Sequence, residues 1–176
     1  LALFCKKISH YFRGGKSVST VLYKPVSGKT ETKVVRANMP KLEKGLGMKQ
    51  TVTFWLWIND LSYREKHFKE ILRKSNNNLS VGIGPRNGDN MSQQFNDGFR
   101  PSENKLFVNI RNNSTIQSLE FNDFPIQKWL HFVIILDNRN VDVFMNGELK
   151  KSMVLESPPA LEEDAELIFN SNGGFD

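Results

Sequence analysis

The chain has 176 residues, of which 39% are hydrophobic and 24% are charged, a composition that supports a folded core and excludes an intrinsically disordered chain. The length fits one domain with an extension, because single domains usually contain about 100 to 200 residues. Cys5 is the only cysteine, and His10, His67 and His131 lie far apart in the sequence. A disulfide framework and a CxxC motif are therefore excluded, and we expect no metal site and no cofactor.

Charge divides the chain into two parts. Residues 1–50 carry eleven Lys or Arg against two Glu, a balance of +9, whereas residues 51–176 carry thirteen against seventeen Asp or Glu, a balance of −4. The pattern predicts a basic, membrane-proximal extension over residues 1–50 and a folded domain over residues 51–176. A solvated tail, an acidic protein surface or nucleic acid would also fit the charge, but without a recognisable nucleic-acid-binding motif nucleic acid is not an expected partner. The side chains expected to contact the membrane surface are Lys6, Lys7, Arg13 and Lys16.

The first residues combine an apolar stretch with a basic pair. Residues 1–5 are apolar and are followed directly by Lys6 and Lys7. Five residues cannot span a bilayer, which takes about 20, but an apolar stretch that meets basic residues is typical of the end of a transmembrane helix. A short buried segment that docks on the domain is the alternative. The following residues, rich in Gly, Lys, Ser and Pro, predict a linker with edge strands near residues 18–23 and 33–37.

A β-pattern begins at Thr51. Over residues 51–58, Val52, Phe54, Leu56 and Ile58 alternate with Thr and Trp, which predicts a central strand with both faces covered. An Asn146-Gly147 pair between two such runs predicts a tight hairpin with a type I′ turn. Many short strands without a convincing helix favour an antiparallel β-sandwich. The other predicted strands are residues 67–73, 79–83, 105–110, 116–121, 129–136, 141–145, 148–154 and 166–169.

The segment 84–103 separates two of these strands and is polar and rich in Gly and Asn. Connections of about 20 residues in compact domains are often functional. We expect this loop to contact a partner or ligand. The candidate residues are Arg86, Asn87, Asp89, Asn90, Phe99 and Arg100.

Several motifs resemble those of laminin G and concanavalin A-like domains, in particular a subgroup encoded by large nucleocytoplasmic DNA viruses. They are W-I-N-D-L-S-Y-R at residues 57–64, V-G-I-G-P at 81–85, P-I-Q-K-W at 125–129, the strand and hairpin over 129–151, and N-G-G-F at 172–175. The resemblance implies a concanavalin A/laminin G-like jelly roll over residues 51–176, whose last strand would continue beyond the chain. It also implies an N-terminal membrane anchor and a place in the virus particle.

The resemblance leads to a hypothesis for the function. We expect a non-enzymatic structural or binding module of a large DNA virus particle, a minor capsid-associated protein that is tethered to the internal membrane and links it to the capsid. The partners would be capsid proteins and membrane lipid, and during assembly the domain would lie on the cytoplasmic side of a host membrane. The alternative is a carbohydrate-binding lectin domain for host attachment, and a β-glucanase is a third possibility.

The candidate residues for chemistry favour binding over catalysis. Residues 162–166 read E-E-D-A-E, which matches the E-x-D-x-E pattern of concanavalin A-like glucanases, whose alternate carboxylates share one face of a strand. Because the segment follows two prolines and has no Trp nearby, we interpret it as an acidic surface loop. We expect His131 to be packed in the core or on the sheet, and Trp55, Trp57 and Trp129 to pack between the sheets rather than to stack on sugars.

Four N-x-S/T sequons begin at Asn78, Asn90, Asn112 and Asn113. They would suit a secreted lectin, in which glycans mark surface loops. A basic cluster after a membrane span predicts instead that the domain stays on the cytoplasmic side, where no glycan is added. The two interpretations conflict, and both remain open.

Overall fold

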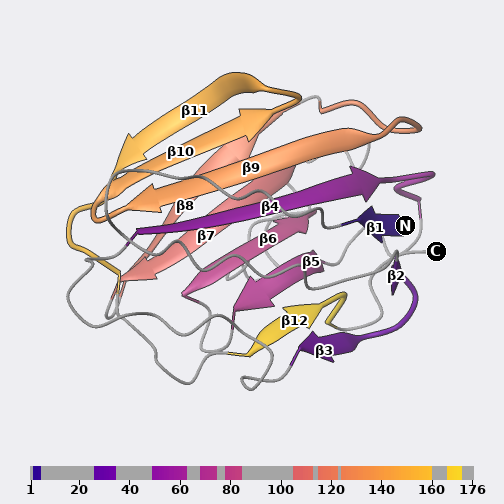
Figure 1. Ribbon diagram of the computed structural model, residues 1–176. Coiled ribbons are helices and arrows are strands. Elements are labelled where there is room, and N and C mark those ends of the chain that lie inside the picture. The colour runs from indigo at the N-terminus through magenta and orange to yellow at the C-terminus, as the bar shows by residue number, and fades with distance from the viewer. Residues whose placement is uncertain are drawn as a thin grey trace, which may run out of the picture.

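The computed structural model describes residues 2–4, 26–34, 49–62, 68–74, 78–84, 105–112, 115–122, 124–159 and 166–171. These residues form twelve strands in two six-stranded sheets, and every strand pair is antiparallel. The sheets lie face to face as a sandwich (Figure 1). The predicted all-β fold is confirmed.

The two sheets have different strand orders. Sheet A has the order β11-β10-β9-β4-β1-β2, and sheet B has the order β3-β12-β5-β6-β7-β8. The strands of sheet A are β1 (Ala2–Phe4), β2 (Val26–Ser27), β4 (Lys49–Trp57), β9 (Leu130–Asp137), β10 (Asn140–Met145) and β11 (Glu148–Val154). The strands of sheet B are β3 (Thr32–Val34), β5 (Lys69–Lys74), β6 (Leu79–Ile83), β7 (Leu106–Asn112), β8 (Thr115–Phe121) and β12 (Leu167–Phe169).

The N-terminal residues contribute three strands to the sandwich. β1 lies between β4 and β2, with Leu3 opposite Leu56 on one side and Val26 on the other. β3 overlaps the edge strand predicted near residues 33–37, whereas the one predicted near residues 18–23 lies outside the described residues. The described part of the chain contains no helix long and apolar enough to cross a membrane. The division of the chain at residue 50 stays a prediction.

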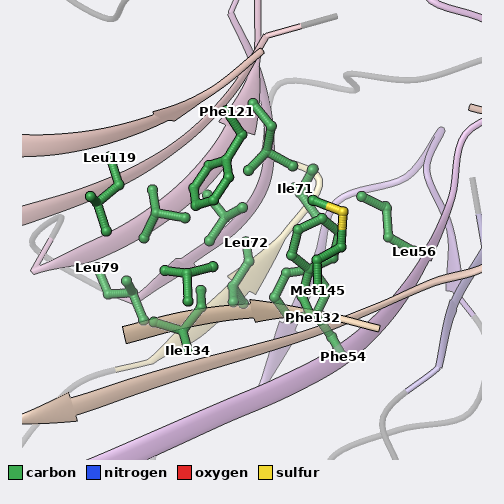
Figure 2. Packing of buried hydrophobic residues seen from close by; sticks show 14 of the residues in the cluster. Phe54, Leu56, Ile71, Leu72, Leu79, Leu119, Phe121, Phe132, Ile134 and Met145 are labelled. Carbon is green, nitrogen blue, oxygen red and sulfur yellow. The ribbon is translucent and has the colours of Figure 1, made fainter. Parts of the chain in front are cut away.

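The core lies between the sheets and follows the period of two residues along each strand. On β4, Phe54 and Leu56 point inward and are buried, and on β9 the same holds for Phe132 and Ile134. The rings of Phe54 and Phe132 stack with their centroids 5.3 Å apart. Figure 2 shows these residues beside side chains from sheet B, among them Leu72. Each such side chain removed from water stabilises the fold by about 1.5–3 kcal/mol.

A tight turn joins β10 to β11, as the sequence predicted. Asn146 has φ 53° and Gly147 has φ 86°, the positive values that a type I′ turn requires at both central positions. Val143 pairs with Lys151 and Phe144 with Leu149, so Lys150 is the additional residue of a β-bulge. The Asn-Gly pair therefore fixes both the hairpin and its register.

Side chains tie the sheets together on both open sides of the sandwich. On one side, the residues after β11 reach β7 and β8: the Glu156 N–H donates to Gln117 Oε1 at 3.0 Å, and Asn112 Nδ2 donates to the Ser157 carbonyl at 3.2 Å. On the other side, Asn170 Nδ2 at the end of β12 donates to the Ser27 carbonyl on β2 at 3.1 Å. These bonds hold the two layers in a fixed relation.

Candidate functional site

An aromatic cluster covers part of the outer face of sheet A. Trp55 and Trp57 alternate with the inward residues Phe54 and Leu56, so they project from the opposite side of β4. His131 on β9 is the register partner of Trp55. We call Trp55, Trp57, Trp129 and His131 the aromatic face.

The prediction that the three tryptophans pack between the sheets was wrong. The core face of β4 is taken by Phe54 and Leu56, and successive side chains of a strand point to opposite sides. Trp55 and Trp57 are half-buried on the outside, and Trp129, just before β9, is 44% exposed. The prediction for His131 as a sheet-packed residue agrees with its half-buried place on the outer face.

The rings of the aromatic face form two pairs. Trp55 stacks on His131 with centroids 4.7 Å apart and an angle of 26° between the planes. Trp57 and Trp129 have centroids 5.7 Å apart and planes inclined by 56°, so the two indoles pack against each other in a tilted arrangement. A large aromatic side chain that is held in place yet exposed is typical of a contact site.

His131 is anchored by three hydrogen bonds. Its ring atom Nε2 lies 2.8 Å from Thr53 Oγ1. Its backbone N–H donates to Asn146 Oδ1 at 2.9 Å, and its backbone carbonyl accepts from the Asn146 N–H at 2.8 Å. Burial lowers the pKa of His131 below its usual 6.5, so the ring is neutral at pH 7. The β10–β11 turn and the aromatic face are thereby joined.

A second set of bonds fixes the position of Trp129. The loop before β9 contains Gln127 in a left-handed conformation, φ 58°, which is uncommon for a residue other than glycine. Its N–H donates to the Ile58 carbonyl at 2.7 Å, and its Nε2 donates to the Asn59 carbonyl at 3.2 Å. The segment directly after β4 and the loop before β9 are therefore joined, which brings Ile58 and Asn59 of one sequence motif beside Gln127 of another.

Asp60, in the loop after β4, accepts hydrogen bonds from a residue two positions later in the sequence. Asp60 accepts from the Ser62 N–H at 2.9 Å and from the Ser62 hydroxyl, and these bonds lower the pKa of Asp60. The aromatic face itself is uncharged, because its three indole rings and the imidazole of His131 are neutral. An uncharged surface of this kind suits non-covalent contact with a partner. Within the described ranges, no three His, Cys, Asp or Glu residues are grouped so as to hold a metal ion.

The candidate site residues from the sequence are almost all outside the described residues. The basic residues Lys6, Lys7, Arg13 and Lys16 and all six candidates in the loop 84–103 fall outside the described residues, and so does most of the acidic motif. Glu166, its last carboxylate, is half-buried directly before β12. The aromatic face itself was missed as a site, although the Thr/Trp side of residues 51–58 was the signal that could have indicated it.

Solved structures with the same fold are only distantly similar in sequence. A receptor binding domain of botulinum neurotoxin mosaic serotype C/D matches with a TM-score of 0.50 and 17% identity over 79% of this chain and 33% of that chain. A point mutant of HCR/D matches with a TM-score of 0.53 and 17% identity, covering 100% of this chain and 44% of that chain. This chain therefore spans less than half the length of either protein. A likeness at this identity shows the fold alone, and no curated protein sequence matches the chain.

Sequence comparison agrees with the fold and extends to most of the chain. The model of the concanavalin A-like lectin/glucanases superfamily matches residues 30–176. The match begins shortly before β3 and includes every later strand of both sheets. With its two antiparallel six-stranded sheets and this match, the chain belongs to the concanavalin A-like lectin/glucanases superfamily.

Proposed function

We propose that this domain is a non-enzymatic binding module that uses the aromatic face as its contact surface. The observation that carries the proposal is the exposure of Trp129, a large apolar ring that is kept at the surface against Trp57. Tryptophan is enriched among the residues that dominate binding energy in protein interfaces. Burying the free surface of Trp129 against a partner would therefore contribute a substantial part of the affinity.

The rigidity of the aromatic face supports this role. Trp55, Trp57 and His131 lie on or at the end of paired strands, and Gln127 fixes the approach to Trp129. Side chains that are already ordered lose little conformational entropy on binding. A surface of this kind is pre-organised for a partner.

The setting that we propose for the module is a large DNA virus particle, in which it would link the internal membrane to the capsid. The support comes from the five ordered motifs and from the charge division, +9 over residues 1–50 against −4 over the rest. Each Lys or Arg near an anionic membrane surface contributes about 1 kcal/mol of attraction. Lys6, Lys7, Arg13 and Lys16 would lie at the lipid, and the sandwich would contact capsid proteins.

The setting and the contact surface can be tested separately in the full-length protein. Flotation with anionic vesicles and detection in purified particles test the setting, and a soluble protein that is absent from particles would refute it. Trp129→Ala tests the surface, with Ile116→Ala as the control because Ile116 is 46% exposed on sheet B. We expect only Trp129→Ala to reduce incorporation into particles, and equal incorporation of both variants would exclude the aromatic face as the contact.

Carbohydrate binding is the second candidate, and the exposed indole of Trp129 specifically favours it. The superfamily includes lectins by its description, and one structural neighbour is a receptor binding domain. A glycan array with no hits at high protein concentration would count against this function. A β-glucanase that uses the acidic motif should lose its activity in Glu162→Gln, so an unchanged activity in that variant would dispose of this alternative.

A further inference from the structure

We propose that residues 26–34 form a clasp between the two sheets that opens as one unit, with the buried carboxylate of Glu70 as its trigger. Opening uncovers the outer edge of β1 in sheet A and that of β12 in sheet B. A further strand can pair with the backbone groups of an uncovered edge, so the clasp controls access to both edges. The clasp contains none of the residues of the aromatic face and does not depend on the proposed function.

The clasp joins the edges of both sheets. Its first part, β2, is the outermost strand of sheet A, and its last part, β3, is the outermost strand of sheet B. Residues 28–31 lie between the two strands and cross from one sheet to the other, as the ribbon from β2 to β3 in Figure 1 shows. Because the same short segment ends in both layers, one motion can release both edges.

The clasp is held by few backbone pairs. Within the described residues, β2 is joined to β1 at two register positions and β3 to β12 at three, whereas β4 and β9 share eight. Short segments at the edge of a sheet open locally at a lower free-energy cost than central strands. The clasp can therefore open while the core of the sandwich stays folded.

Two consecutive residues after β12 connect the clasp to Glu70. Asn170 Nδ2 donates to the carbonyl of Ser27 on the clasp at 3.1 Å. The backbone N–H of Asn170 donates to the Ile71 carbonyl on β5, also at 3.1 Å, and the Ser171 hydroxyl donates to Glu70 Oε2. The clasp and the carboxylate are thus bonded to the same pair of residues, and a change at one affects the other.

The polar groups in this connection are buried, and one of them is not satisfied. Glu70 is 7% exposed, Asn170 1% and Ser171 2%. Among the described residues, Asn170 Oδ1 has no hydrogen-bond partner. A buried carboxylate and a buried acceptor without a partner both cost free energy that contact with water would recover. Opening of the clasp would admit this water.

The charged groups that act on Glu70 come from β5 and from the clasp itself. Arg73 Nε lies 3.1 Å from Glu70 Oε2 and attracts the carboxylate. Glu31, in the turn of the clasp, repels it and is itself paired with Lys33 at 3.1 Å. The register partner of Glu70 on β6, Gly82, is uncharged, as are the two residues that follow β12. An ionised Glu70 therefore adds a negative charge that favours release of the clasp.

The proton on Glu70 favours the closed clasp. Burial is the largest influence on this carboxyl and raises the pKa of Glu70 above its usual 4.5. Opening exposes the carboxylate to water and returns the pKa towards 4.5, so the closed form holds the proton more tightly than the open form. Release therefore becomes easier as the pH rises from about 4.5 through the pKa of the closed form, and the clasp is most stable below about pH 4.5.

Hydrogen–deuterium exchange of the whole chain, read by mass spectrometry between about pH 4.5 and about pH 8, tests the clasp. Each rate is divided by that of the unfolded chain at the same pH, which gives a protection factor. We expect β2 and β3 to share one protection factor, at least about 100-fold below that of β9. No protection of residues 26–34, different values for β2 and β3, or a value equal to that of β9 would overturn the inference.

Variants of two carboxylates test the trigger. In the wild type, the protection of the clasp should fall at least about threefold over this pH range. Glu70→Gln keeps an acceptor for Ser171 but cannot ionise, so its clasp should show no such fall. The matched control is Glu120→Gln, because Glu120 pairs with Lys105 at 3.3 Å on β8, at the opposite edge of sheet B from β3. It should behave like the wild type, and an unchanged fall in Glu70→Gln would exclude Glu70 as the trigger.

A disulfide tests the opening without changing Glu70. Lys33 and Ile168 are register partners on β3 and β12, and opposed Cα atoms of antiparallel strands lie about 4.5–5.5 Å apart, within the range that a disulfide spans. Lys33→Cys with Ile168→Cys, in a Cys5→Ser background, should slow exchange of the clasp at least about tenfold when oxidised, and reduction should restore it. Equal exchange of the oxidised and reduced forms would show that β3 does not leave β12 and would refute the clasp.

Discussion

Thr53 Oγ1 and His131 Nε2 lie 2.8 Å apart on the outer face of sheet A and join β4 to β9 through their side chains. The stacked Trp55 ring covers the same imidazole, and burial lowers the pKa of His131 below 6.5. As the pH falls below 6.5, the unfolded state binds this proton more readily than the folded state. The stability that His131 contributes is therefore complete above about pH 6.5 and is lost below it.

We therefore expect His131→Gln to reduce the dependence of stability on pH. The glutamine amide can still bond to Thr53 but cannot take up a proton in this range. Urea unfolding between about pH 5 and pH 7 should give a flatter curve for the variant than for the wild type. Parallel curves would show that His131 does not titrate differently in the two states.

Glu70 should produce the opposite pH dependence. It is buried on β5, 3.1 Å from Arg73 Nε, and accepts a hydrogen bond from the Ser171 hydroxyl. Burial raises the pKa of Glu70 above 4.5 and outweighs the lowering by Ser171 and Arg73. The folded state thus holds this proton more tightly, and the associated stability, fully present below about pH 4.5, is lost as the pH rises through the folded pKa.

Glu70→Gln is accordingly expected to raise the melting temperature at neutral pH, because an amide can accept from Ser171 without the cost of a buried charge. The gain over the wild type should shrink as the pH is lowered towards about 4.5. Thermal unfolding at several pH values measures it. A loss of stability at neutral pH would mean that the Arg73 ion pair outweighs the burial of the charge.

Core and surface aromatic residues should respond differently to truncation. Phe54 is 1% exposed and stacked on Phe132, so Phe54→Ala should lower the free energy of unfolding by about 3–5 kcal/mol. Trp129→Ala should lower it by less than about 1 kcal/mol, because much of that ring already faces solvent. Denaturant unfolding of both variants gives the comparison. A loss for Trp129→Ala as large as that for Phe54→Ala would make the tryptophan a structural residue.

Position 82 on β6 requires glycine because the ring of Phe68 lies very close to it. A Cβ at this position would lie 2.3 Å from Phe68 Cζ and 2.8 Å from the Lys69 carbonyl oxygen. The Phe68 ring could move, but the carbonyl belongs to the paired strand β5. Gly82→Ala should therefore destabilise the fold by about 1–3 kcal/mol in denaturant unfolding. An unchanged stability would show that β5 and β6 separate at little cost.

The strands from β4 onward could be predicted from the sequence because each follows a local pattern. The hairpin at Asn146 and Gly147 and the strand at residues 79–83 agree with the structure, since turn residues and the period of two are local properties. The prediction for residues 105–110 ended too early, because Arg111 and Asn112 are held in β7 by pairing with β8. Pairing of this kind depends on a neighbouring strand.

The same dependence on neighbours explains what could not be predicted. Residues 1–5 fit an anchor or a docked segment equally well, and the pairing of Leu3 with Leu56 and Val26 is a tertiary property. The aromatic face arises because Trp55 pairs with His131 and because Gln127 brings Trp129 beside Trp57. The two residues of each pair, Trp55 with His131 and Trp57 with Trp129, lie far apart in the sequence, so no short segment contains both.

The sequons at Asn78 and Asn112 should not carry glycans in the folded domain. Asn112 is 2% exposed, its Nδ2 donates to Gln117 Oε1 at 3.3 Å and to the Ser157 carbonyl, and its Oδ1 accepts from Thr115 Oγ1 at 2.8 Å. Asn78 is buried as well. A glycan on Nδ2 would remove donors that tie β7 to the segment after β11, which costs about 1–3 kcal/mol for each buried group left unpaired.

Expression through a secretory pathway and mass spectrometry of the folded fraction test this expectation. Peptides with Asn78 should have unmodified mass, and in a variant with Asn113→Gln the peptide with Asn112 should also be unmodified. A glycan found on Asn112 of folded protein would contradict the hydrogen bonds to Gln117 and Ser157. Because Asn90 lies outside the described residues, a glycan on its peptide alone would leave the arrangement of β7 and β8 intact and would support exposure of the domain to a secretory compartment.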